Sequence, residues 1–349
     1  MKLFVSGGAG FIGSHFVRYI LSLPEKHRVV NYDMLTYAGN LANLRGITQD
    51  ERYSFLRGDI RDTAAVEAGM RGCDAVVHFA AESHVDRSIY EPEPVIGTNV
   101  TGTFVLLQVA RTLNIERFVQ ISTDEVYGDM PPGTFADEDS PLRPSNPYAA
   151  SKAAADLLVL SYVRTYSFPA VITRSSNNYG PFHFPEKFLP LIITNALEDK
   201  PLPIYGDGKQ QRGWLYVEDN CRGIHAVLEH GRIGEVYNLG GVDIEENITV
   251  ARQVLHLMDK PESLISYVKD RPGHDRRYAI RCQKIERDLG WKPAVSFNEG
   301  LHRTIDWYKQ NAEWLAGVRD GEYRSYYEKY YKNRDSSLQA LAQSGSISI

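Results

Sequence analysis

Residues 2–13 read KLFVSGGAGFIG, a short apolar run followed at once by a glycine turn. Residues 14–23 continue with apolar positions at helical spacing, so strand, glycine turn and helix come in the order of a βαβ unit. In such a unit Gly7 permits the tight turn, Gly10 lets the backbone approach a pyrophosphate, and Gly13 lets the helix pack on the strand. The N-terminus of the helix then faces the anion. The stretch therefore predicts a dinucleotide-binding α/β domain.

Further apolar runs have the length of buried strands, namely residues 28–32, 53–56, 75–79, 117–122 and 170–174. Residues 98–113 have helical periodicity and precede the fourth of these runs. Strands that alternate with helices form parallel sheets, because each crossover places a helix on one face of the sheet. The sequence therefore predicts the α/β fold class, with a Rossmann-type doubly wound parallel sheet.

An acidic residue ends the second strand. Asp33 lies twenty residues after Gly13, the spacing at which a carboxylate accepts hydrogen bonds from the adenosine ribose hydroxyls. A 2′-phosphate would be repelled there, so the position favours NAD over NADP. Asp59, after the third strand, is placed to meet the adenine amino group. Ala80 and Ala81, after the fourth strand, let a cofactor lie close across the strand tips.

Histidines near the fourth strand have different expected roles. His78 lies inside the apolar run and is expected to be a core residue. His84 and Asp86 follow in a loop, where a structural role and a site role fit equally well.

Tyr148 and Lys152 stand in a predicted helix that begins near Pro147, with Asn146 or Ser145 as its cap. Since they are four residues apart, the two side chains share one helix face. An ammonium beside a phenol favours the phenolate and lowers its pKa. The pair therefore predicts a tyrosine base that takes a proton from a hydroxyl group near neutral pH.

Thr123, Asp124 and Glu125 follow the fifth strand directly. Adjacent residues of an extended chain point to opposite sides, so the two carboxyls are expected to reach two different atoms of one substrate. For Asp124 to act as an acid, burial or the neighbouring carboxylate must raise its pKa. The triplet thus predicts an acid and a base close to the Tyr148 pair.

These motifs resemble those of the extended short-chain dehydrogenases/reductases, on the glycine turn at 7–13 and the YAASK segment at 148–152. Within that superfamily, Thr123-Asp124-Glu125 resembles the catalytic triplet of dTDP-glucose 4,6-dehydratases, where 4-epimerases usually carry Ser or Thr and small residues. The resemblance extends to about Lys309 through residues 80–88, 177–181, 185–187 and 270–278.

The resemblance implies dehydration of dTDP-glucose to dTDP-4-keto-6-deoxyglucose by a hydro-lyase with bound NAD⁺. C4 is oxidised, water is eliminated across C5 and C6, and the hydride returns to C6. Tyr148 would take the 4-hydroxyl proton while Lys152 holds the phenolate and the nicotinamide ribose. Glu125 would take the C5 proton, Asp124 would protonate the departing 6-hydroxyl, and Thr123 would contact the 4-oxygen.

The resemblance also implies binding residues. Those expected to contact NAD are Gly7, Gly10, Phe11, Ile12, Gly13, Asp33, Thr36, Asp59, Ile60, Ala80, Ala81, Thr98, Tyr148, Lys152 and Asn178. Those expected to contact the nucleotide sugar are Ser83, Thr123, Asn177, Glu186, Lys187, Arg212, Asn247, Arg271 and His274. Residues 202–206 would hold the base in a turn. No metal site is expected.

The chain is expected to have two domains and a tail. Residues 1–175 would form the NAD-binding Rossmann domain, to which about 208–235 would return. Residues 176–320 would form a smaller α/β nucleotide-sugar-binding domain, and 321–349 a tail that is partly disordered at its end. The resemblance implies a homodimer through helices near residues 101–111 and 149–159.

Two residues depart from the family pattern. Gly213 follows Arg212 where an acidic residue is usual, and Ser175 stands where Cys is common. Gly213 is expected to loosen Arg212, which leaves a 4,6-dehydratase of a UDP- or GDP-sugar and a sugar-nucleotide 4-epimerase as alternatives. A non-catalytic dinucleotide-sensing protein is a remote alternative, because such proteins typically lose Tyr or Lys of the pair.

Composition agrees with an enzyme that has small-molecule partners. The chain has 349 residues, 43% of them hydrophobic, which is ample for a large core. The net charge of -5 disfavours a nucleic-acid-binding face, and no apolar run is long enough for a membrane span. Cys73, Cys221 and Cys282 lie far apart without metal-site spacing, and no signal peptide is evident, so a cytoplasmic setting is expected.

Overall fold

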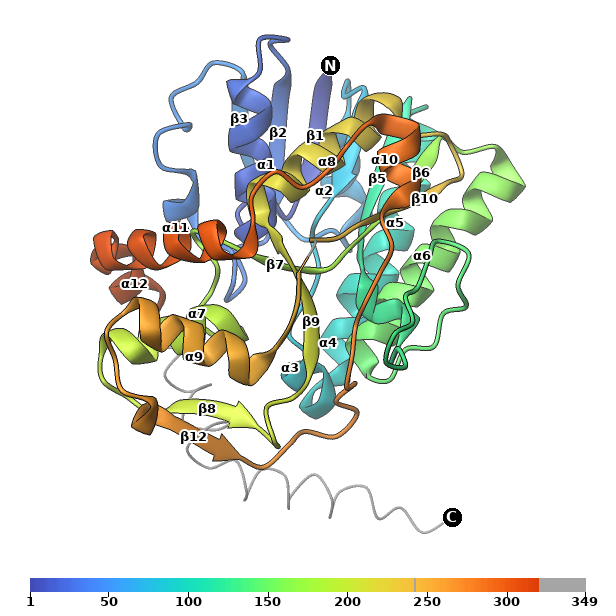
Figure 1. The fold of residues 1–349 in the computed structure, drawn as a ribbon. Helices are drawn as coiled ribbons and strands as arrows, with labels where there is room; N and C mark the ends of the chain where they lie inside the picture. Colours follow the sequence, from blue (N-terminus) through green and yellow to red (C-terminus); the bar gives the residue numbers. More distant parts are fainter. Residues whose placement is uncertain (242, 320–349) are drawn as a thin grey trace.

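The computed structural model describes residues 1–241 and 243–319 (Figure 1). The predicted tail at 321–349 lies outside the described residues. Among the helices of the described part, none is long and apolar enough to cross a membrane.

A parallel sheet of seven strands dominates the described chain. Its order is β10 (Val236–Leu239), β6 (Ala170–Ser175), β5 (Arg117–Thr123), β4 (Ala75–His78), β1 (Lys2–Ser6), β2 (Arg28–Asp33) and β3 (Tyr53–Arg57). All neighbouring strands pair in parallel. The order reverses between β1 and β4, which is the topological switch point of a doubly wound sheet. The predicted Rossmann-type fold class is confirmed.

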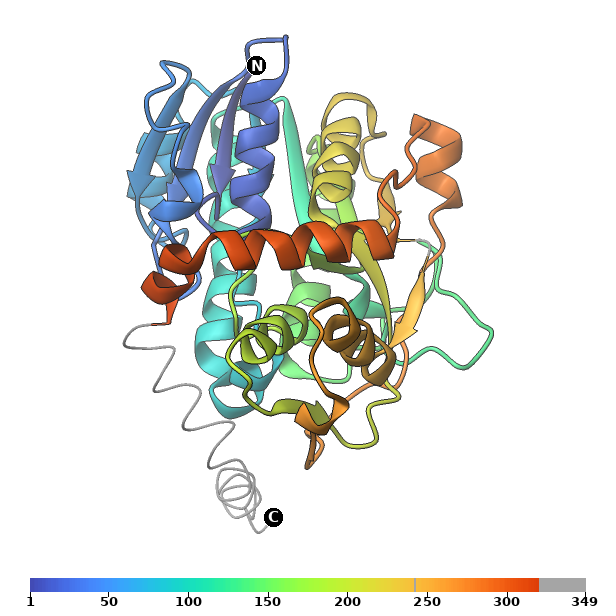
Figure 2. The same ribbon diagram turned by 60° about the vertical axis from the view of Figure 1, so that its left-hand side comes forward.

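Helices cover both faces of this sheet. On one face α1 (Phe11–Ser22) and α8 (Val217–His230) lie side by side (Figures 1 and 2) and bury Phe16, Ile20 and Val227 against the strands. On the other face are α2 (Thr63–Met70), α5 (Thr103–Thr112) and α6 (Pro147–Tyr166), which bury Leu106 and Val159. A buried apolar side chain contributes roughly 1.5–3 kcal/mol, so these two layers supply much of the core's stability.

A smaller α/β part lies beside the carboxyl ends of the strands. Its sheets are β11 (Ile244–Glu246), β9 (Gln211–Tyr216) and β7 (Asn177–Tyr179) in that order, and β12 (Ile265–Val268) paired with β8 (Leu202–Tyr205). Its helices are α7 (Phe188–Leu197), α9 (Asn247–Leu257), α11 (Phe297–Gln310) and α12 (Ala312–Val318). Figure 2 shows α11 passing across the molecule between the two parts. A separate core that includes Leu189, Trp214 and Val254 holds these elements together.

The predicted turn at 202–206 is wrong for most of its length. Residues 202–205 are strand β8, which pairs in parallel with β12, and only Gly206, with φ +59°, turns the chain. Leu202 and Ile204 are fully buried, which explains why this segment forms a strand. Within residues 208–235, α8 packs on the large sheet, while β9 pairs in the smaller sheet.

The predicted helix at 98–113 has a more complex beginning. After α3 (Val85–Tyr90) and α4 (Pro92–Ile96), residues Gly97–Gly102 form a π-helical turn that leads into α5. Within it, Asn99 exchanges hydrogen bonds with the backbone of Glu82 and donates to Ser151 at 2.8 Å. The turn therefore fixes the loop after β4 against α6. Such turns are frequent at functional sites.

His78 is a core residue, as predicted. It is 1% exposed, and its ring nitrogens lie within hydrogen-bond distance of Ser6 and Thr103. Shorter elements complete the fold: the helical turns Leu41–Leu44, Asp124–Tyr127 (η3) and Glu262–Leu264, and α10 (Gln283–Leu289).

Candidate active site

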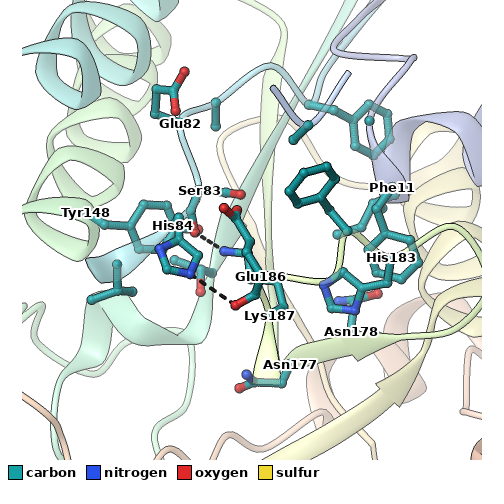
Figure 3. Close-up of a pocket in the computed structure, with 18 of the residues that line it drawn as sticks. Phe11, Glu82, Ser83, His84, Tyr148, Asn177, Asn178, His183, Glu186 and Lys187 are labelled. Carbon is teal, nitrogen blue, oxygen red and sulfur yellow. Dashed lines mark hydrogen bonds between the residues drawn. The ribbon is translucent and has the colours of Figure 1, made fainter. Parts of the chain in front are cut away.

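A cavity of about 400 Å³ opens where the carboxyl ends of the large sheet meet the smaller part (Figure 3). Every residue that the sequence individually assigns to the chemistry, to NAD or to the nucleotide sugar lines this cavity, whereas of the segment 202–206 only Pro203 and Tyr205 do. These residues come from positions 7 to 274, so the fold gathers into one place side chains that are far apart in the chain.

The glycine turn leaves no room for side chains. A Cβ on Gly7, whose φ is +77°, would lie 2.4 Å from the Ala80 backbone nitrogen, and one on Gly13 would lie 2.2 Å from the Gly7 oxygen. The Asp33 carboxylate accepts from the Ala9 backbone nitrogen at 2.9 Å, which joins the end of β2 to the turn. The bare backbone before α1 fits a dinucleotide pyrophosphate, and Asp33 beside it fits the ribose.

The predicted catalytic triplet does not have the extended backbone that the sequence suggested. Thr123 ends β5, but Asp124 and Glu125 begin the helical turn η3. The Thr123 hydroxyl accepts a hydrogen bond from the Glu125 backbone nitrogen at 3.3 Å and so caps this turn. The prediction that alternation along a strand separates the carboxyls is therefore wrong, because the cap interrupts the strand.

Asp124 is held as a weak acid by its surroundings. It is 3% exposed, and its Oδ2 has no hydrogen-bond partner among the described residues. Burial, followed by the negative charge of Glu125, raises the pKa of Asp124 to about 8, although the Arg212 charge opposes this. Asp124 is thus protonated at neutral pH, as an acid that protonates a departing hydroxyl requires.

The predicted effect of Lys152 on Tyr148 is wrong in this structure. The Lys152 ammonium donates to the Ile121 carbonyl at 2.6 Å, and burial lowers its pKa to about 8. Burial and then the Glu125 charge raise the pKa of Tyr148 well above its usual value, while a hydrogen bond with Thr123 acts in the opposite direction. The pKa of the Tyr148 phenol is therefore set by burial and by the neighbouring residues Thr123 and Glu125.

The helix that carries this pair begins as the sequence suggested. Asn146, one of the two predicted caps, accepts from the Ala149 backbone nitrogen at 2.9 Å, and Pro147 occupies the first turn. Asp156, about two turns after Tyr148 on α6, forms a buried ion pair with Arg174 at 2.9 Å. This ion pair fixes α6 against β6, and hence the position of Tyr148 relative to the sheet.

Lys187 and Glu186 link the smaller part to the loop after β4. Figure 3 shows Lys187 directed at the Ser83 backbone oxygen, to which it donates, and His84 directed at the Glu186 backbone oxygen, 3.3 Å away. The Glu186 carboxylate pairs with Arg87 at 3.2 Å. Asn177 and Asn178 lie on β7 at the same wall of the cavity (Figure 3).

Arg212 is firmly held, so the expected loosening by Gly213 is wrong. Its guanidinium donates to the backbone oxygens of Gln211 at 2.8 Å and Asp275 at 2.9 Å and lies over the Tyr278 ring. None of these contacts uses the side chain at position 213. A Cβ on Gly213 would meet Ser176 at 3.4 Å, an ordinary contact.

The remaining basic residues of the predicted substrate site are paired. Arg271 forms an ion pair with Asp86 at 3.1 Å, and His274 lies 2.6 Å from the Asp270 carboxylate. Asp86 and His84, whose roles the sequence left open, both line the cavity and both hold loops. The structural role is therefore observed for both side chains, and both also border the cavity.

Tyr278 was missed by the sequence analysis. It is 2% exposed, its hydroxyl donates to Asp275 at 2.7 Å, and the same oxygen lies 3.4 Å from Glu125 Oε2. Its place at the end of the 270–278 motif is the signal from which it could have been predicted. Further lining residues outside the predicted set include Glu82, His183, Phe188 and Trp214.

Comparisons with known proteins agree with this geometry. Residues 4–304 match the family model described as GDP-mannose 4,6 dehydratase. The dTDP-glucose 4,6-dehydratase of Shigella flexneri is 49% identical over 361 residues, which cover 96% of this chain and 100% of that protein. The Xanthomonas campestris enzyme of the same name is 49% identical, with 92% and 96% covered.

Two solved structures are also similar to this chain. A Streptomyces venezuelae dTDP-glucose 4,6-dehydratase with NAD and TYD bound has a TM-score of 0.89 and 48% identity, covering 91% of this chain and 100% of that one. A Thermus thermophilus UDP-glucose 4-epimerase with NAD has a TM-score of 0.82 and 31% identity, covering 89% and 100%. On this identity and coverage, the chain belongs to the dTDP-glucose 4,6-dehydratase family.

Proposed function

We propose that this enzyme is an NAD-dependent hydro-lyase that converts dTDP-glucose to dTDP-4-keto-6-deoxyglucose. The observation that carries the proposal is the buried Asp124, with its pKa raised to about 8, next to Glu125 and facing the same cavity as Tyr148. An acid and a base side by side are what the elimination of water requires, and a simple 4-epimerisation needs neither.

The protein's own groups divide the proton transfers. Tyr148 takes the 4-hydroxyl proton as the phenolate, a form that burial opposes and that the hydrogen bond with Thr123 favours. Thr123 also orients the 4-oxygen. The 4-ketone acidifies the C5 proton, which Glu125 removes. Asp124 gives its proton to the 6-hydroxyl, which leaves as water, and Glu125 then returns a proton to C5. When bound, NAD⁺ supplies the acceptor for the hydride from C4 and its donor to C6.

The binding residues are assigned by position along the cavity. We propose that residues 1–175, with the segment at about 208–235, bind NAD through the glycine turn, Asp33 and Lys152. Residues 176–320 then bind the nucleotide sugar. Arg212 and Arg271 lie buried in that wall, where guanidinium groups suit a diphosphate.

Two finer features complete the proposal. A homodimer through α5 and α6 is supported by Phe104 and Leu157, large apolar side chains on these helices that are 42% and 58% exposed. A cytoplasmic, reducing setting is supported by free thiols at Cys73, Cys221 and Cys282.

A substrate panel tests the proposed reaction. Incubation with dTDP-glucose is expected to give a product lighter by one water, with no net accumulation of reduced nicotinamide. Mass spectrometry measures the substrate and the product, and absorbance measures reduced nicotinamide. UDP-glucose and GDP-glucose serve as competing substrates. Absence of a dehydrated product from all three nucleotide sugars would contradict a dehydratase. An isomer of unchanged mass, separated from the substrate by chromatography, would indicate a 4-epimerase.

The pH dependence of the elimination tests Asp124. Because Asp124 acts in its protonated form and its pKa is about 8, the rate of product formation is expected to fall above roughly pH 8, approaching tenfold per pH unit. Lys152 also titrates near 8, but it acts on C4 oxidation, which is followed separately by nicotinamide absorbance in single turnovers. In Asp124→Asn the elimination is expected to slow and to lose this alkaline limb. A limb that persists unchanged in Asp124→Asn would contradict the assignment.

A further inference from the structure

A second cluster of potential ligands lies away from the cavity. His27 stands in the turn between α1 and β2, and His225 and Glu229 are one turn apart on α8. One ligand atom from each of the three side chains lies within 4.8 Å of the others. The neighbouring positions of α1 and α8 over one face of the sheet bring the cluster together (Figures 1 and 2).

The facing atoms of this cluster are buried and unpaired. His27 Nε2, His225 Nε2 and Glu229 Oε1 have no hydrogen-bond partner among the described residues. His27 is only 4% exposed, and the His225 Nε2–Glu229 Oε1 distance of 3.6 Å is too long for a good hydrogen bond. A buried polar atom without a partner is costly, so convergence of three such atoms points to a bound group that all of them contact.

The ligand chemistry favours a transition-metal ion. Imidazole nitrogens with no hydrogen-bond partner in the described part of the chain, such as His27 Nε2 and His225 Nε2, offer lone pairs to a metal ion. Two imidazoles and one carboxylate form a common Zn²⁺ ligand set, with a fourth position open to water. Zn–N bonds of about 2.0–2.1 Å place tetrahedral ligand atoms roughly 3.3 Å apart. The His225 Nε2–Glu229 Oε1 distance is 3.6 Å, and all three ligand atoms lie within 4.8 Å of one another, so small side-chain rotations bring them to this spacing.

Neighbouring groups fix the orientation of the two rings. The Tyr19 ring meets the His225 ring edge-on, with centroids 5.6 Å apart. His27 Nδ1 lies 3.5 Å from the N-terminal ammonium of Met1, so Nε2 is the ring nitrogen left for the cluster. The cluster therefore has one buried ligand and two more at regular helical spacing, all held by packing.

We propose that His27, His225 and Glu229 bind a divalent transition-metal ion, Zn²⁺ by preference, which joins α8 to the start of β2. The active-site end of β2 is Asp33, and a strand rises about 3.3 Å per residue, so the ion lies roughly 20 Å from the cavity. Its role is to stabilise the Rossmann domain and not to take part in the reaction. The inference does not depend on the proposed substrate.

Zn²⁺ titration of the full-length enzyme after EDTA treatment tests the site. Calorimetry is expected to give about one high-affinity equivalent for the wild type, and Tm is expected to rise with Zn²⁺ concentration. His225→Ala and Glu229→Gln are expected to lose both effects and to keep wild-type turnover. His256→Ala, which changes an exposed histidine on α9, is the matched control and is expected to behave as wild type.

Either of two results would overturn the site. One is equal Zn²⁺ binding by the wild type and Glu229→Gln, which would place the ion among the other histidines. The other is an NMR pH titration in which His27 and His225 take up a proton together and Zn²⁺ does not change the curve. This result would show that the two imidazoles share a proton and do not bind the ion. Because the Glu229 side chain is 31% exposed, Glu229→Gln is expected to fold normally, and circular dichroism checks this.

Discussion

Glu125→Gln is expected to stop exchange of the sugar C5 proton with solvent and to lower product formation by about 10²–10⁴-fold, the usual contribution of a general base. The amide keeps the size of the side chain and its contact with Tyr278, but it cannot accept the proton. Oxidation at C4 does not use Glu125, so reduced nicotinamide should accumulate in single turnovers. Deuterium incorporation measured by mass spectrometry follows the exchange.

The same substitution has an electrostatic consequence. The Glu125 charge raises the pKa of both Asp124 and Tyr148, so its removal should lower both values. C4 oxidation, which uses the phenolate form of Tyr148, should therefore be faster at a given pH in Glu125→Gln than the raised pKa of the wild type allows.

Glu138→Gln is the matched control for this variant. Glu138 is a partly buried carboxylate that accepts from the Asn238 backbone nitrogen at 2.9 Å, and it is not among the residues that line the cavity. Wild-type exchange is expected in Glu138→Gln. Exchange that continues at the wild-type rate in Glu125→Gln would remove Glu125 from its role.

Tyr148→Phe is expected to slow C4 oxidation by about 10²–10⁴-fold, since it removes the group that takes the 4-hydroxyl proton. The Tyr148 ring packs with Val85 and Val95, and phenylalanine keeps this packing. Bound NAD and the fold should therefore be retained. The measurement is the rate of nicotinamide reduction in a single turnover with saturating substrate.

Tyr162→Phe provides the comparison on the same helix. Tyr162 is buried against the large sheet and lies outside the set of cavity residues, so its variant should oxidise substrate at the wild-type rate. Oxidation by Tyr148→Phe at a rate near that of Tyr162→Phe would exclude Tyr148 as the base.

Much of the fold could be predicted because its signals are local. The strands of the large sheet before β10, the glycine turn and the start of α6 each depend on neighbouring residues, and periodicity or capping reveals them. Strand β8 was missed, since it pairs with β12 about sixty residues later, and no local pattern around Pro203 announces that partner. The bend of Asp124 and Glu125 into η3 was missed because a single hydrogen bond to Thr123 decides it.

The sequence by itself determined the order of strand, glycine turn and helix, the adjacency of Asp124 and Glu125, and the spacing of Tyr148 and Lys152. These are properties of neighbours along the chain. Only the tertiary structure decided the pKa of Asp124, the bond from Lys152 to the Ile121 carbonyl and the meeting of His27 with α8. The reason is physical: burial and distant contacts set the local dielectric and the available partners, and spacing along the chain encodes neither.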